Sequence, residues 1–167
     1  TAAVDPAVAY LATDILEGVI DSGTGTSADI GRPAAGKTGT TQEYRDAWFV
    51  GYTPDLVASV WVGYPESQVE MTNVHGIKVT GGSFPAKIWA AFMKAALANT
   101  AESDFERPDG LTSATICLES GEIATEYCTS TGTVLFLAGK LPVTCTLHAA
   151  PVMVKVPNLI GTMKSDA

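Results

Sequence analysis

The sequence predicts an α+β domain in which an antiparallel sheet is flanked by helices. Two stretches rich in aromatic and β-branched residues, DAWFVGY at 46–52 and LVASVWVGY at 56–64, are separated only by the turn residues TPD. They therefore predict adjacent antiparallel strands. Helix patterns lie on both sides of them along the chain. The length of 167 residues and a hydrophobic content of 46% suit one compact domain with a buried core.

The first element is a predicted helix that begins after Asp5. Asp5 is a favourable N-cap and Pro6 suits the first helical position, and the pattern ends near Ser22 and Gly23. Apolar residues at helical spacing are expected to form its buried face, namely Val8, Leu11, Ile15 and Val19. The small and polar stretch GTGTSADIG that follows predicts a loop.

Three neighbouring antiparallel strands are expected near 33–42, 46–53 and 56–64. The turn residues between the second and third favour a direct connection. In the third strand both alternating faces are mostly apolar, which is typical of a central strand that is covered on both sides.

A second helix is expected over 85–97, after a long glycine-containing loop. Ser83 precedes it as a candidate cap. The apolar face of this helix is expected to contain Ile88, Phe92 and Ala96, flanked by Trp89 and Leu97. Such a helix can cover one face of the sheet.

Changes in composition along the chain predict three parts. Beyond Thr100 an acidic linker leads to a hairpin predicted around Ser120 and Gly121, and then to a segment with cysteines. The expected parts are 1–99, a cysteine-containing tail at 100–150 and a last part at 151–167. The chain also starts and stops abruptly within helix patterns, and we expect it to be an excised piece of a longer protein.

Charge and hydropathy exclude two classes of partner. Ten basic against 18 acidic residues give a net charge of -8, and no Lys/Arg cluster occurs, so no nucleic-acid partner is expected. No run approaches the roughly 20 apolar residues that are needed to cross a bilayer.

The cysteines are confined to the last third of the chain, at Cys117, Cys128 and Cys145. We expect an exported context in which Cys128 and Cys145 form a disulfide, which would stabilise the fold by about 3 kcal/mol. A zinc site formed by the three thiols and His148 is the alternative. Because the spacing contains no C-x-x-C pair, we expect no metal site, and no cofactor is expected elsewhere.

The stretch GRPAAGKTGT at 31–40 fits two chemistries. Read from Gly31 it is G-x-x-x-x-G-K-T, the pattern of a phosphate-binding P-loop. A P-loop needs a buried strand before it and a helix after it. The residues before Gly31 are small or polar, and those after Thr38 lead into a strand pattern. The sequence therefore favours the second interpretation, the K-T-G-T motif of serine acyl-transferases that bind β-lactams.

The residue types of K-T-G-T suit an edge strand that binds an extended substrate. Lys37 offers a fixed positive charge, and Gly39 lets a ligand backbone approach closely. Thr38 and Thr40 offer hydroxyls to a substrate carboxylate, and an amide near Thr40 can donate to a developing oxyanion. We expect Lys37 and Thr40 to be catalytic. The expected substrate-binding residues are Thr38, Gly39, Thr40 and Thr41, and the alternative is an ordinary exposed strand lysine beside a tight turn.

Four stretches together resemble the C-terminal half of a penicillin-binding protein transpeptidase domain, most closely that of the bifunctional high-molecular-weight class. They are AYLATDILEGVIDSGTGTSA, RPAAGKTGTTQEYRDAWFVGYTP, VWVGYPE and GGSFPAKIWAAFM. The resemblance implies a penicillin-binding/serine β-lactamase-like fold, in which K-T-G-T lines the active-site cleft from the edge of a five-stranded antiparallel sheet. Family members use a serine nucleophile in S-x-x-K together with an S-x-N motif. Neither motif occurs in this sequence, and the family order places both upstream of Thr1.

The function that this resemblance implies is that of a D,D-transpeptidase, which crosslinks peptidoglycan stem peptides through a serine acyl-enzyme and is trapped by β-lactam antibiotics. The chain alone is expected to be inactive, because the N-terminal half of the domain is missing. Its uncovered sheet is expected to recruit a partner chain or to self-associate. The alternative function is a non-catalytic module that binds peptidoglycan or another cell-wall protein.

The last stretch, VKVPNLIGTMKSDA, resembles the opening of a PASTA module. Such modules are appended to cell-wall enzymes of Gram-positive bacteria. The resemblance implies an extracytoplasmic location at the cell surface, with an anchor in the plasma membrane supplied by an upstream segment.

Overall fold

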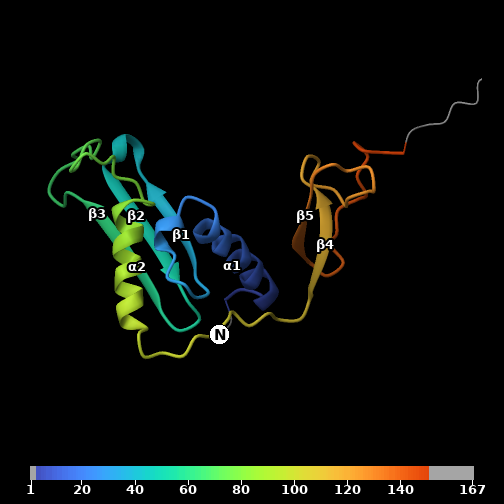
Figure 1. Ribbon diagram of the computed structural model, residues 1–167, viewed down its shortest axis with the longest axis horizontal. Helices are drawn as coiled ribbons and strands as arrows, with labels where there is room; N and C mark the ends of the chain where they lie inside the picture. The colour runs from blue at the N-terminus through green and yellow to red at the C-terminus, as the bar shows by residue number, and fades with distance from the viewer. Residues whose placement is uncertain (1–2, 151–167) are drawn as a thin grey trace, which may run out of the picture. The chain divides into compact units, whose positions relative to one another are not determined.

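A computed structural model describes residues 3–150 of the chain and divides it into two compact units, Thr1–Leu111 and Thr112–Ala167 (Figure 1). In the described residues the first unit contains a three-stranded sheet, two α-helices and two short 3-10 helices, at Thr26–Ala28 and Gln42–Tyr44, and the second contains two strands. The predicted last part, including the PASTA-like opening, lies outside the described residues. Among those residues no helix is long and apolar enough to span a membrane.

The sheet of the first unit consists of β1 (Ala35–Thr40), β2 (Asp46–Tyr52) and β3 (Val57–Gly63), paired in that order and antiparallel. This confirms the three predicted neighbouring strands. The expectation that the third strand is central is wrong for the described part of the chain, where β2 is central and β3 pairs with β2 alone. Val57 of β3 is accordingly 66% exposed.

Helix α1 (Pro6–Asp21) begins as predicted, because the Asp5 carboxylate accepts hydrogen bonds from the first free backbone N–H groups. Its predicted buried face is only partly right, since Leu11 and Val19 are half-buried. Val8 and Ile15 are exposed, and the buried positions are Ala7, Thr13 and Ile20. The Thr13 hydroxyl lies 2.9 Å from the Tyr52 hydroxyl, so the side of α1 that carries Thr13 contacts the sheet.

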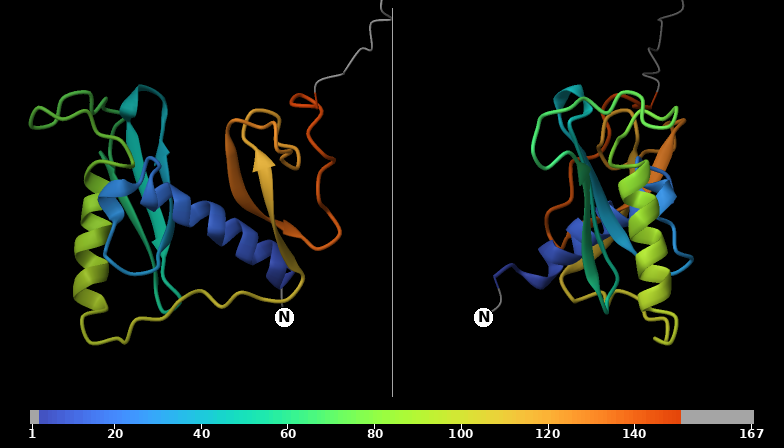
Figure 2. Two further views of the ribbon diagram at one scale, coloured as in Figure 1. Left: turned by 45° about the vertical axis from the view of Figure 1, so that its right-hand side comes forward. Right: turned by 90° about the vertical axis from the view of Figure 1, so that its left-hand side faces the viewer.

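Helix α2 (Phe84–Ala96) lies on one face of the sheet (Figure 2). Its N-cap is Ser83 as predicted. The centre of the predicted buried face is wrong, since Ile88 is 48% and Phe92 is 51% exposed, whereas the flanking Trp89 and Leu97 are buried. The buried positions are Pro85, Ala86, Trp89, Ala90 and Met93.

Trp89 explains the rotation of α2. Its ring packs edge-on against Phe49 at 5.3 Å between centroids. Its indole N–H donates to the carbonyls of Gly51 at 3.2 Å and Ala58 at 3.1 Å. A buried indole needs such a partner, which an aliphatic side chain does not, so the helix places Trp89 over the sheet in preference to Ile88.

The second unit is built on β4 (Leu111–Cys117) and β5 (Thr131–Leu137), which pair with each other. The predicted hairpin turn follows β4. The N–H of Gly121 donates to the Cys117 carbonyl at 2.8 Å, and the N–H of Cys117 donates to the Glu122 carbonyl at 2.8 Å. Gly121 has a φ of 73°, a left-handed conformation that favours glycine.

Candidate functional site

The K-T-G-T motif forms most of β1 and divides between the two faces of the sheet. Cross-strand pairing sets Lys37 against Val50 and Gly39 against Trp48 on one face. Thr38 and Thr40 alternate with them and belong to the opposite face, which α2 covers. The P-loop interpretation is thereby excluded, because Lys37 and Thr38 lie within a strand and do not begin an α-helix.

The backbone of β1 has one edge that no other described strand occupies. The N–H of Thr41 donates to the Asp46 carbonyl at 3.0 Å, so these residues form a hydrogen-bonded pair of the β1–β2 ladder. Alternation along an antiparallel ladder then directs the N–H and C=O groups of Thr38 and Thr40 away from β2, towards the open edge. The Lys37 Nζ reaches the same edge and donates to the Thr38 carbonyl at 3.1 Å. Charge and backbone donors therefore meet along this edge.

Two loops from elsewhere in the first unit hold the threonine hydroxyls. Thr24, in the loop after α1, places its hydroxyl 2.7 Å from that of Thr38. The N–H of Gly81, in the loop before α2, donates to the Thr40 hydroxyl at 3.0 Å. Neither Thr24 nor Gly81 was predicted to belong to the site. Their signals in the sequence are the glycine-rich GTGT and GGSF stretches, which predict loops and carry the family resemblance.

Gly81 has no room for a side chain. A Cβ on this residue would lie 2.3 Å from the Trp48 carbonyl oxygen and 2.7 Å from the Gly39 nitrogen. The loop therefore touches the backbone of β1 and β2 directly, and this contact fixes the position of the motif.

Thr41 lies at the turn between β1 and β2. Its hydroxyl accepts a hydrogen bond from the N–H of Asp46 at 2.8 Å and lies 3.3 Å from the Asp46 carbonyl. These contacts shape the turn, so the expected role of Thr41 in substrate binding stays a prediction.

The face of the sheet that carries Lys37 is apolar and partly open. Trp48 and Trp61 are cross-strand partners with ring centroids 6.3 Å apart, and Val50 lies beside them. All three are more than one third exposed. The Trp61 indole N–H donates to the Asp46 carboxylate at 2.9 Å, which fixes the ring on this face.

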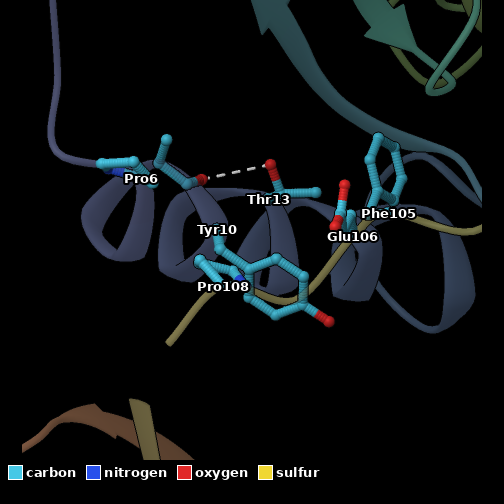
Figure 3. Close-up of a pocket in the computed structure, with 7 residues that line it drawn as sticks. Pro6, Tyr10, Thr13, Phe105, Glu106 and Pro108 are labelled. Atoms are coloured by element: carbon cyan, nitrogen blue, oxygen red, sulfur yellow. Dashed lines mark hydrogen bonds between the residues drawn. The ribbon is translucent and has the colours of Figure 1, made fainter. Parts of the chain in front are cut away.

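A groove of about 390 Å³ lies elsewhere in the first unit, between α1 and the segment after α2 (Figure 3). Its lining residues are Pro6, Ala9, Tyr10, Thr13, Phe105, Glu106 and Pro108. Partial burial raises the pKa of Tyr10, and the negative charge of Glu17 adds to this effect. No residue of the K-T-G-T motif lines the groove.

Cys128 and Cys145 are free thiols in the structure, as is Cys117, so the expected Cys128–Cys145 disulfide is not formed there. The Ser120 hydroxyl lies 3.3 Å from the Cys145 sulfur, and this hydrogen bond lowers the pKa of Cys145 to about 6.

A K-T-G-T motif on the edge of an antiparallel sheet, with a helix packed on one face, is the arrangement expected in the class of serine acyl-transferases that bind β-lactams. Comparisons with known proteins specify the family. Residues 2–94 match the penicillin binding protein transpeptidase domain, and residues 107–150 match the penicillin-binding protein 1A, C-terminal domain. The chain belongs to the penicillin-binding protein transpeptidase family.

Individual relatives agree with this assignment. Penicillin-binding protein 1A of Clostridium tetani is 35% identical over 144 residues, which cover 83% of this chain and 18% of the relative. The protein of the same name from Mycolicibacterium smegmatis is 39% identical over 110 residues, which cover 63% of this chain and 14% of the relative. The chain thus spans less than a fifth of the length of these curated relatives.

Solved structures support the fold. The penicillin-binding protein PonA1 from Mycobacterium tuberculosis aligns with a TM-score of 0.56 at 37% identity, covering 61% of this chain and 28% of that protein. Penicillin-binding protein 1A from Haemophilus influenzae aligns with a TM-score of 0.66, covering 84% of this chain and 21% of that protein. Its identity of 24% supports the fold alone. The predicted α+β transpeptidase fold and the family resemblance are therefore confirmed.

Proposed function

We propose that this chain forms the K-T-G-T side of the active site in a peptidoglycan D,D-transpeptidase. The observation that carries the proposal is the open edge of β1, where the Lys37 ammonium and the outward backbone groups of the motif converge. Membership of the transpeptidase family gives these groups their chemical context. A structure of the related PonA1 in complex with penicillin V supports β-lactams as ligands of the complete site.

In the proposed reaction a serine oxygen attacks the carbonyl carbon of a stem-peptide amide, and the amine of that bond leaves with a proton. The acyl group then passes from the serine to an amine of a neighbouring stem peptide, which forms the crosslink. The serine is supplied by an S-x-x-K motif in a part of the domain upstream of Thr1. The role of this chain is to position the substrate and to stabilise the charge that develops on the carbonyl oxygen.

Each residue of the motif has a separate part in this proposal. The Thr40 N–H, directed to the open edge of β1, donates to the oxyanion. The Thr38 and Thr40 hydroxyls bind the substrate carboxylate, with Thr24 and Gly81 holding them in place. The Lys37 ammonium lies beside the edge and adds positive charge next to the reacting centre. Gly39 leaves the edge without a side chain that would obstruct an extended peptide.

The open apolar face of the sheet supports the proposal that further protein covers it. Trp48, Val50 and Trp61 form an exposed apolar patch, and such patches commonly mark a surface that contacts other protein. We assign this surface to contact with the upstream half of the transpeptidase domain. When that half is absent, the same surface favours self-association of the chain. An extracytoplasmic location with an upstream membrane anchor, and a PASTA-like module after residue 150, complete the proposal.

Covalent labelling by a fluorescent penicillin tests the proposed function. The full-length protein is expected to gain one label per chain at a serine upstream of Thr1. The 167-residue chain alone is expected to keep its unmodified intact mass, because it contains no S-x-x-K motif. Failure of the full-length protein to react would instead support the non-catalytic binding module. A stoichiometric adduct on a serine of the chain alone would contradict the assignment of roles.

A further inference from the structure

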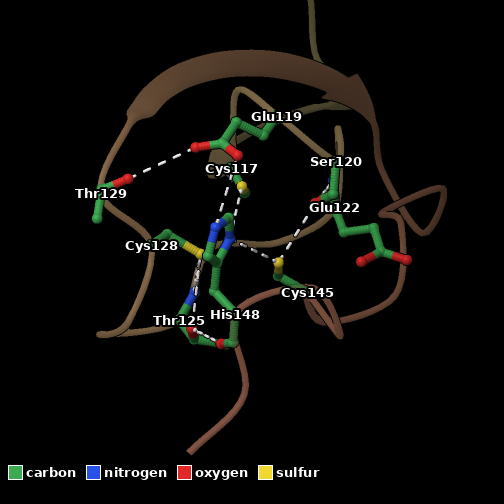
Figure 4. Close-up of polar contacts among 9 residues, drawn as sticks. All are labelled: Cys117, Glu119, Ser120, Glu122, Thr125, Cys128, Thr129, Cys145 and His148. Atoms are coloured by element: carbon green, nitrogen blue, oxygen red, sulfur yellow. Dashed lines mark hydrogen bonds and ion pairs between the residues drawn. The ribbon is translucent and has the colours of Figure 1, made fainter.

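Four side chains of metal-binding type converge in the second unit from positions that are far apart in the sequence (Figure 4). They are Cys117, at the end of β4, Cys128, in the loop between β4 and β5, and Cys145 and His148, both after β5. The three sulfur atoms and one imidazole nitrogen all lie within 4.8 Å of one another. We call this group the Cys3His cluster.

The distances within the cluster suit tetrahedral coordination. Zn–S bonds of about 2.3 Å and Zn–N bonds of about 2.0 Å place neighbouring ligand atoms roughly 3.5–3.8 Å apart. The His148 Nδ1 atom lies 3.4 Å from the Cys117 sulfur and 3.7 Å from the Cys145 sulfur. We propose that the Cys3His cluster binds one structural zinc ion. This proposal is independent of the proposed function.

The surroundings of the cluster are those of a metal site. The other imidazole nitrogen of His148, Nε2, lies 3.6 Å from the Glu119 carboxylate. A carboxylate on the distal nitrogen fixes the orientation of a metal-binding histidine and makes it a better ligand. The Thr125 hydroxyl donates to the His148 carbonyl at 2.7 Å and so holds the backbone of this ligand as well.

The sulfur atoms receive hydrogen bonds of the kind that stabilise thiolates. The Ser120 hydroxyl donates to the Cys145 sulfur at 3.3 Å. The backbone N–H of Thr125 donates to the Cys128 sulfur at 3.3 Å. Donors at these positions compensate the negative charge that three thiolate ligands bring to one ion.

The second unit has few buried side chains, so it needs another source of stability, which a structural metal can provide. In its described part, residues 112–150, the only buried residues are Cys117 and Cys145. A unit well below about 70 residues, as this one is, rarely gains enough stability from a hydrophobic core alone and is usually stabilised by a disulfide, a metal or a partner. The cluster therefore occupies the place of a hydrophobic core. Four protein ligands fill a tetrahedral site, which favours a structural ion over a catalytic one.

A disulfide is the competing arrangement, because it would use two of the same sulfur atoms. A disulfide would not explain why the third cysteine and the His148 imidazole lie beside the other two sulfur atoms. The sequence contains one close pair of ligands, Cys145-x-x-His148, whose separation equals that of the C-x-x-C pairs in zinc sites. The zinc proposal accounts for all four side chains.

Metal content and affinity test the proposal. The 167-residue chain, prepared under reducing conditions and dialysed against metal-free buffer, is expected to retain one zinc per molecule by elemental mass spectrometry. His148→Asn is expected to lose this zinc, whereas His75→Asn is the matched control and should retain it. His75 lies in an exposed loop with a φ of 50°, which asparagine tolerates. Glu119→Gln should weaken zinc binding by about 10–100-fold, with Glu126→Gln unchanged.

A second measurement keeps the test independent of variant folding. Cobalt(II) added to the unmodified, metal-free chain should give thiolate-to-cobalt charge-transfer absorption with a stoichiometry of one, and zinc should displace it. Absence of these bands would overturn the proposal. Two other results would also overturn it. One is a disulfide, seen in the intact mass of a chain purified without metal, together with failure of that chain to bind zinc after reduction. The other is an equal zinc content in the two histidine variants.

Discussion

The contact between Gly81 and the K-T-G-T strand predicts a large effect of a single methyl group. In Gly81→Ala the new Cβ would meet the Trp48 oxygen at 2.3 Å and the Gly39 nitrogen at 2.7 Å, far inside ordinary contact distances. Both atoms belong to the backbone of paired strands, which cannot swing aside as a side chain can. The loop must therefore move by about 1 Å, which strains the hydrogen bond from Gly81 to Thr40. Overpacking and the lost hydrogen bond together are expected to cost about 2–4 kcal/mol.

Thermal unfolding of the 167-residue chain, followed by tryptophan fluorescence, measures this cost. At roughly 4 °C per kcal/mol, the melting temperature of Gly81→Ala should fall by about 8–16 °C. Gly18→Ala is the matched control. Gly18 lies in α1 with no atom within 4 Å of its Cβ position, so the same substitution there should stabilise the helix by about 0.5–1 kcal/mol. Equal melting temperatures for Gly81→Ala and the unmodified chain would refute the proposed packing of the loop on β1.

Two further predictions concern the site and the core. In the full-length protein, Lys37→Ala should slow acylation by a β-lactam about 100-fold or more. Its melting temperature should hardly change, since an exposed charge contributes little to folding. Lys87→Ala, at an exposed position of α2, is the control, and an unchanged acylation rate for Lys37→Ala would return Lys37 to the role of an ordinary strand lysine. In the isolated chain, Trp89→Ala should lower the free energy of unfolding by about 3–5 kcal/mol in urea titrations. Its exposed neighbour Ile88→Ala should lower it by less than about 1 kcal/mol, and similar losses for both would contradict the observed orientation of α2.

The strands and their order along the chain could be predicted because their signals are local. The alternating pattern of β2 and the turn residues after it fixed two strands to within about two residues. The turn itself is formed as expected, with the Thr53 hydroxyl accepting hydrogen bonds from the N–H groups of Asp55 and Leu56. Which strand is central could not be predicted in the same way. The apolar faces of β3 indicate that other residues cover this strand, but they do not indicate whether it has a neighbouring strand on each side.

The buried faces of the helices were predicted only in part, for a related reason. In each helix the apolar stripe is wider than the surface that touches this sheet, as Ile15 and Ile88 show by their exposure. Periodicity identifies the whole stripe, whereas specific contacts select the part that is used. For α1 the selection depends on the Thr13–Tyr52 hydroxyl contact, and for α2 on the acceptors available to Trp89. Both contacts depend on residues of the sheet, so the spacing of apolar residues within one helix cannot reveal them.

The Cys3His cluster and the K-T-G-T site differ in how far a sequence motif can describe them. In K-T-G-T the reactive geometry follows from one strand, because alternation along β1 separates the side chains and directs the backbone donors. Support for it comes from the loops of Thr24 and Gly81, which the motif does not contain. The ligands of the cluster, in contrast, come from three separate segments: the end of β4, the loop between β4 and β5, and the chain after β5. The folded unit brings these segments together. A rule that requires closely spaced cysteines therefore does not find this cluster, which contains the four side chains of the proposed zinc site. The physical requirement is convergence of the ligand atoms in space, and the scarcity of other buried side chains among residues 112–150 agrees with a metal in place of a hydrophobic core.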